Sequence, residues 1–166
     1  MPPAIQYFLA ALAIREKLSP ESAKVIETLN ALGKAANHEG FLFGDTKSLE
    51  VAKGYLTRAL EIEQRVAPDS SLSVETLTLL GKNDTRTTGT AIERGNDQSA
   101  ASQHYLAALQ IQKKLAPGGS VEEAGILEKI GDLELALTDL AAAHEHLAEA
   151  VAMVERVAPD SATLVW

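Results

Sequence analysis

The chain has 166 residues, of which 46% are hydrophobic and only 4% aromatic, and its formal net charge is −8. An acidic chain without a basic stripe argues against binding to nucleic acid or anionic membranes, and the absence of cysteine excludes disulfides and thiolate metal sites. With no signal peptide and no apolar run of the ~20 residues that a membrane span needs, we expect a soluble, cytoplasmic protein of closely packed helices.

Four segments of the chain align without gaps, and each ends in a proline. In every copy one alanine stands nine residues before the proline and another stands sixteen residues before it. Positions 16, 12, 9, 8, 5 and 2 residues before the proline recur at steps of three and four, which predicts an apolar stripe on a helix that the proline ends. The four segments are residues 7–20, 55–68, 104–117 and 146–159.

A helix that carries a glycine follows each of the first three prolines, and it is expected to form a pair with the next proline-ended helix. The serine after each proline is well placed to cap this helix, and Ser120 with Glu123 has the spacing of a capping box. A glycine inside a helix costs up to about 1 kcal/mol relative to alanine. Its recurrence at one register, as Gly33, Gly81 and Gly131, indicates that a partner helix crosses there.

These signals predict seven helices and two inserted loops. The prolines are 48, 49 and 42 residues apart, so the first two intervals are six and seven residues longer than the third. We expect these extra residues to form loops near 40–48 and within 82–98. Phe41, Leu42 and Phe43 are expected to fold back over the repeat edge, and a contact patch is the alternative. The expected helices span residues 4–18, 22–38, 49–66, 71–84, 98–115, 121–137 and 140–157.

The last full copy shows the pattern most clearly. Alanine, leucine and alanine follow its glycine at offsets of 12, 16 and 19 residues, as Ile130-Gly131, Ala143, Leu147 and Ala150. This resembles the tetratricopeptide repeat (TPR), and the 42-residue step to Pro159 is similar to the variety typified by kinesin light chains. That variety also occurs in bacterial proteins that join TPRs to CHAT (caspase-like) proteases or signalling NTPases. The family's usual Gly-Asp or Gly-Asn turn is Thr138-Asp139 here, so the family pattern does not predict the conformation of this turn.

The resemblance implies an all-α fold, in which antiparallel helix pairs stack into an α-solenoid with a right-handed superhelix. We interpret residues 1–166 as a single repeat domain and a fragment of a longer array, or as a chain whose copies associate end to end to complete each other's half repeats. Its expected parts are a half repeat at 1–20, full repeats at 21–68, 69–117 and 118–159, and the start of another repeat at 160–166.

Catalysis is not expected, because the chain lacks an HExxH motif, a phosphate-binding loop and a nucleophile elbow. His144 and His146 are two residues apart, so on a helix they point to different faces and cannot chelate one metal. His104 and His146 occupy a repeat position that is tyrosine elsewhere, which predicts a half-buried packing role. Glu61 and Glu63 are expected on a solvated face. We predict no cofactor and no metal.

Binding has more support than catalysis, because the TPR resemblance implies that the first helix of each pair lines a concave groove. Groove positions lie three before and one, four and five after the glycine. The expected groove residues are Asn30, Lys34, Asn37, Thr78, Lys82 and Arg86. The same positions also hold His38, Thr85, Glu128, Asp132, Leu135 and Ala136.

This set of amides, hydroxyls and cations predicts a non-catalytic scaffold that binds a peptide or a partner protein in the groove. A polar face that merely stays hydrated is one alternative. A regulatory or sensor arm of a larger enzyme, such as a CHAT protease or a signalling NTPase, is the other.

Overall fold

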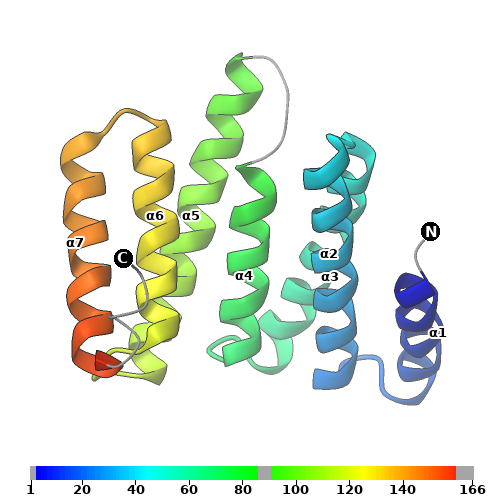
Figure 1. The fold of residues 1–166 in the computed structure, drawn as a ribbon. Coiled ribbons are helices and arrows are strands. Elements are labelled where there is room, and N and C mark those ends of the chain that lie inside the picture. Colours follow the sequence, from blue (N-terminus) through cyan, green and yellow to red (C-terminus); the bar gives the residue numbers. More distant parts are fainter. Residues whose placement is uncertain (1–2, 86–90, 160–166) are drawn as a thin grey trace.

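The computed structural model describes residues 3–85 and 91–159, and the regular structure of this part is entirely helical. In Figure 1 the helices follow one another across the molecule from α1 at one end to α7 at the other, and α2 and α3 overlap in this view. None of the described helices is long and apolar enough to cross a membrane. The helices are α1 (Pro3–Leu18), α2 (Ala23–Phe43), α3 (Thr46–Val66), α4 (Ser71–Asp84), α5 (Ala91–Leu115), α6 (Val121–Ala136) and α7 (Leu140–Val157).

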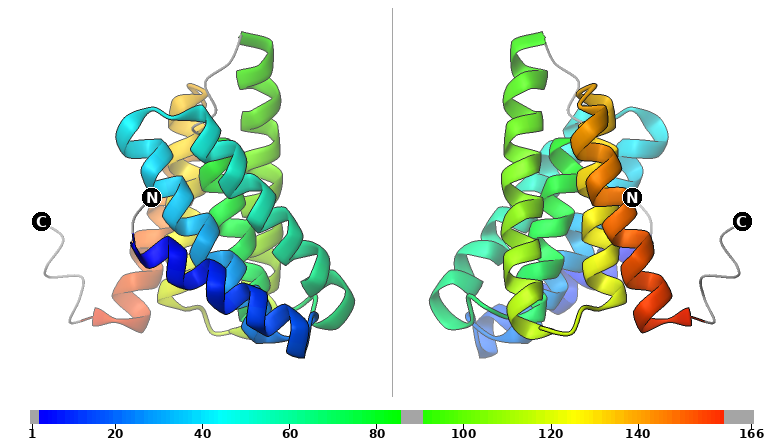
Figure 2. Two further views of the ribbon diagram at one scale, coloured as in Figure 1. Left: turned by 90° about the vertical axis from the view of Figure 1, so that its right-hand side faces the viewer. Right: turned by 90° about the vertical axis from the view of Figure 1, so that its left-hand side faces the viewer.

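The helices form antiparallel pairs that stack along one direction (Figures 1 and 2). The most extensive contacts join α2 to α3, α4 to α5 and α6 to α7. Smaller contacts join α3 to α4 and α5 to α6, and α1 packs on α2 as α3 packs on α4. This arrangement is an all-α solenoid of paired helices, which confirms the predicted fold class.

The helix ends lie close to where the prolines and the capping serines predict them. Helices α1, α3, α5 and α7 each stop two residues before a proline. Ser70 Oγ accepts a hydrogen bond from the Ser73 amide at 3.2 Å, and Ser120 Oγ accepts one from the Glu123 amide at 3.0 Å. Ser22 also stands at an N-cap, but its side chain makes no capping hydrogen bond. The capping prediction is therefore confirmed for two of the three helices.

The glycines of α2, α4 and α6 mark the points of closest helix contact. Each lies against the large residue twelve positions before the following proline, and the pairs are Gly33–Leu56, Gly81–Tyr105 and Gly131–Leu147. A β-carbon at any of the three glycines would lie 2.6 Å from that side chain, which is too close for real atoms. Alanines at repeated positions are also fully buried, namely Ala52, Ala59, Ala101, Ala108 and Ala143. The predicted packing role of the glycines is confirmed.

The extra residues near 40–48 do not form the predicted loop. Helix α2 continues to Phe43, and α3 begins at Thr46, so the excess lengthens both helices. Helices α2 and α3 can pack closely here because Gly40 has no β-carbon. A β-carbon at this position would lie 2.5 Å from Leu49 Cδ2. Gly44 then turns the chain in the left-handed conformation, with φ of 64°. The second predicted loop is shortened as well, because α5 already begins at Ala91; residues 86–90 lie outside the described part.

The turn between α6 and α7 places a β-branched residue in a conformation that suits glycine. Thr138 has φ of 63°, almost the angle of Gly44, and both residues precede an aspartate that caps the next helix. A side chain in this region costs about 1–2 kcal/mol. We expect Thr138→Gly to raise the free energy of unfolding by about 1 kcal/mol in urea denaturation. Gly44→Thr should lower it by a similar amount, and a Thr138→Gly variant less stable than the parent would contradict this account of the turn.

Candidate partner-binding surface

The first helices of two neighbouring pairs present cations at equivalent positions. Lys34 of α2 and Lys82 of α4 each follow the packing glycine of their helix, and both are exposed. Thr78, three residues before Gly81, is half-buried and its hydroxyl bonds to Val74 O within the same helix. Since α2 and α4 contact each other directly, these side chains belong to one surface. We use the name first-helix face for the exposed residues at these repeat positions of α2, α4 and α6, and those of α6 are Glu128 and Asp132.

The two predicted asparagines are buried rather than exposed. Asn30 is 1% exposed and its Oδ1 accepts a hydrogen bond from Thr76 Oγ1 at 2.9 Å. Asn37 is 2% exposed; its Oδ1 accepts from Asn83 Nδ2 at 2.6 Å, and its Nδ2 donates to Leu79 O at 3.3 Å. Both amides therefore join α2 to α4 and are not available to a partner in this conformation. Arg86 lies outside the described residues.

The sequence predicted that Phe41, Leu42 and Phe43 all fold back over the repeat edge. Only Phe41 does so. The Lys82 ammonium lies 5.3 Å from the centre of the Phe41 ring, which is cation–π distance. The contact orients a lysine of α4 over the end of α2. Leu42 and Phe43 are exposed instead, so the prediction is wrong for these two. They stand at the last turn of α2, where no later turn of the helix can cover them.

The histidines at the repeated position are half-buried, as predicted, and each bonds to an acid that the sequence reasoning missed. His104 Nδ1 lies 2.8 Å from Asp84 Oδ2, and His146 Nδ1 lies 2.8 Å from Glu134 Oε2. Both acids stand three residues after the packing glycine, where the first repeat has alanine. The joint change of acid and histidine between repeats is the sequence signal that would have identified the pairs.

Glu63 is the main electrostatic feature that the sequence reasoning placed wrongly. Glu61 is exposed as expected, but Glu63 is fully buried between α3 and α4. Burial raises the pKa of Glu63 to about 7, while hydrogen bonds from Thr76 and Ser73 act in the opposite direction. Thr76 Oγ1 lies 2.7 Å from Glu63 Oε1, 2.9 Å from Asn30 Oδ1 and 3.0 Å from Leu72 O.

One hydroxyl proton cannot serve three acceptors. A protonated Glu63 that donates to Thr76 reduces the acceptors of this proton from three to two, Asn30 Oδ1 and Leu72 O, and this agrees with the raised pKa of the carboxyl. Glu63 Oε2 has no hydrogen-bond partner among the described residues, as expected of a group that is neutral rather than charged. Glu63, Thr76 and Asn30 thus form a buried polar chain that links α3, α4 and α2.

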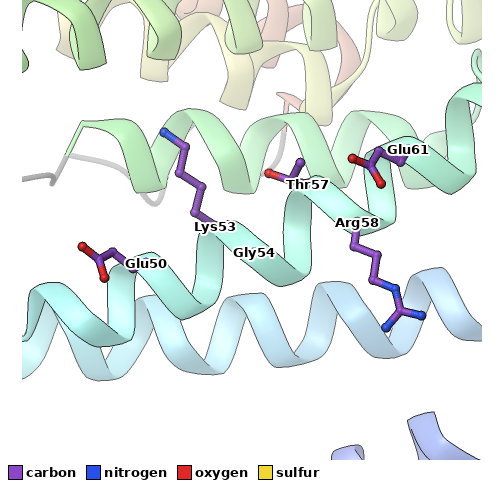
Figure 3. A pocket seen from close by; sticks show the side chains of 6 residues that line it. All are labelled: Glu50, Lys53, Gly54, Thr57, Arg58 and Glu61. Atoms are coloured by element: carbon purple, nitrogen blue, oxygen red, sulfur yellow. The ribbon is translucent and has the colours of Figure 1, made fainter.

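An open pocket of about 550 Å³ runs along the exposed side of α3 (Figure 3). Its two cations are already engaged within the chain, since Lys53 Nζ lies 2.8 Å from Asp84 and Arg58 Nη1 lies 2.7 Å from Glu16. Among the residues that the structure describes, no group of three or more acids and histidines could hold a metal ion. The pocket therefore offers no arrangement that suggests chemistry. It is lined by Glu50, Lys53, Gly54, Thr57, Arg58 and Glu61.

Comparisons with known proteins support the class of fold. No protein-family description matches the chain, and no curated protein is similar to it in sequence. Among solved structures, BtubC (BKLC) from P. vanneervenii, a kinesin light chain-like TPR protein, is similar with a TM-score of 0.70 and 22% sequence identity. The match covers 98% of this chain and 57% of BtubC, so the chain spans little more than half of that protein. At this identity the likeness shows the fold alone, which is a TPR-like helical repeat.

Proposed function

We propose that the chain is a non-catalytic protein-interaction scaffold of the 42-residue TPR variety, with repeats at 21–68, 69–117 and 118–159. A peptide or a partner protein binds along the first-helix face. The observation that carries this proposal is the pair Lys34 and Lys82, two exposed cations at the same repeat position on adjacent helices. Neither forms an ion pair with a described residue, so both can accept an anionic partner.

The charges of the first-helix face also suggest how a peptide is oriented. Lysines stand on α2 and α4, whereas Asp132 stands at the equivalent position of α6, and Glu128 lies one turn before it. Lys129 lies 3.2 Å from Glu128 and 3.7 Å from Asp132, so α6 keeps one net negative charge among these three residues. A peptide with an acidic segment over α2 and α4 and a basic segment over α6 matches both signs. Arg86, the groove position predicted from the sequence five residues after Gly81, would add a further cation. The buried amides Asn30 and Asn37 contribute indirectly, because their hydrogen bonds fix α2 against α4 and so fix the spacing of the two lysines.

The proposal is tested with peptides selected from a random display library against the whole chain. We expect the selected peptides to be acidic at one end, and Lys34→Glu with Lys82→Glu to weaken their binding at least about tenfold, as lost interfacial charge pairs do. The matched control, Lys17→Glu with Lys114→Glu, makes the same change of net charge on second helices and should leave the affinity within about twofold. Equal losses in both double variants would show that net charge, rather than the first-helix face, determines binding.

A further inference from the structure

The first repeat contains a second concave feature, an apolar pocket of about 290 Å³ between α1, α2 and α3. Ile5 and Leu9 of α1 form one wall, Val51 and Tyr55 of α3 form the other, and α2 forms the floor. Cavities of roughly 150 Å³ bind benzene in other proteins, so this volume has room for a phenyl ring. The left view of Figure 2 looks onto this end of the molecule, where α1 crosses in front of the α2–α3 pair.

The pocket exists because the first repeat lacks charged residues that the next repeat has. In the second repeat, Lys53, Asp84 and His104 occupy the positions of Ile5, Ala36 and Tyr55, and they form a network with two 2.8 Å contacts. That network occupies the equivalent space between α3, α4 and α5. In the first repeat the same positions hold isoleucine, alanine and tyrosine, which leave an apolar space that can take a further side chain.

An exposed aromatic side chain stands beside this pocket. Phe43 is 78% exposed and follows the floor residues Leu32, Ala36 and Glu39 at steps of four, three and four residues along α2. These steps place all four residues on one face of the helix, so Phe43 stands one turn beyond the floor. The surface thus carries both a hollow and a projecting apolar group.

We propose that this surface binds a second copy of the chain about a two-fold axis, with Phe43 of each copy in the pocket of the other. A two-fold interface must be complementary to itself. This surface meets that requirement twice, because it pairs a pocket with a projecting phenyl ring and an acid, Glu39, with a base, Lys47, in the pocket lining. The inference does not rest on the first-helix face, and it differs from end-to-end association through the uncovered side of α1.

Sedimentation equilibrium of the whole chain over a range of concentrations tests the proposal. The parent should approach twice the monomer mass. Phe43→Ser and Val51→Glu alter exposed residues and should each raise the dimer dissociation constant at least about tenfold, with unchanged circular dichroism. Ile14→Ser, on the exposed side of α1 and outside the pocket, should leave the dimer intact. A parent that stays monomeric throughout overturns the proposal, and so does a dimer that Ile14→Ser weakens and Phe43→Ser does not.

Charge reversal gives an independent readout of the same geometry. Glu39→Lys and Lys47→Glu should each weaken the dimer, because each places like charges across the two-fold axis. The double variant restores opposite charges and should recover association. If the double variant is as weak as the single ones, the two residues do not meet across the interface and the proposed two-fold arrangement is wrong.

Discussion

Gly81→Ala is expected to lower the free energy of unfolding by about 2–3 kcal/mol, because the new methyl group overpacks a helix contact that cannot widen freely. Its β-carbon would lie 2.6, 2.8 and 2.9 Å from three ring atoms of Tyr105, and Tyr105 is only 2% exposed. Either the ring leaves its site or α4 and α5 separate. Urea denaturation followed by circular dichroism measures the loss.

Gly54→Ala is the matched control for this prediction. Gly54 also lies inside a helix, but a β-carbon there meets nothing within 4 Å. The substitution should therefore raise the free energy of unfolding by about 0.5–1 kcal/mol through helix propensity alone. If both variants change stability by the same amount and with the same sign, the repeated glycines do not act through packing.

Glu63→Gln is expected to remove a pH dependence of about 3 kcal/mol from the free energy of unfolding. The pKa of Glu63 is about 7 in the folded chain against an ordinary value of 4.5, so between these values the folded chain keeps a proton that the unfolded chain releases. Stability from this group is therefore full below pH 4.5 and falls as the pH rises to 7, by about 1.4 kcal/mol per unit. Glutamine stays neutral and should give the more stable protein at pH 8.

The control for this prediction is Glu61→Gln, which alters an exposed carboxylate on the same helix two residues away. Urea denaturation of the parent and both variants from pH 4 to pH 8 separates the contribution of Glu63 from that of the other acids. The difference between Glu63→Gln and the parent should grow through the window, whereas Glu61→Gln should follow the parent. A constant difference for Glu63→Gln would mean that the buried carboxyl has an ordinary pKa.

The features that the sequence predicted well are those set by local chemistry or by repetition. Proline marks where helices end, and the recurrence of Gly33, Gly81 and Gly131 predicted their contacts with large residues of the partner helices. Repetition supplies an internal comparison that a single copy would lack. Hence the order of the helices and most of their ends could be predicted.

The features that were missed depend on neighbours distant in the chain. Asn30 has the same repeat position as the exposed Glu128, yet it is buried because Thr76 of the next pair lies against it. Glu63 has an exposed neighbour in Glu61 and is buried by the same contact between pairs. Which polar residues face a partner is therefore decided by the stacking of pairs, and helical periodicity alone cannot show it.

Amide chemical-shift mapping of a display-selected peptide on the isotope-labelled chain tests the proposed function most directly. The largest shifts should fall on α2 and α4 around Lys34, Thr78 and Lys82, with smaller ones near Asp132 of α6. Amides of α3 around Gly54, on the opposite side of the first pair, should stay within experimental error. Shifts concentrated on α3 or α5, with α2 and α4 unchanged, would contradict a binding surface on the first helices.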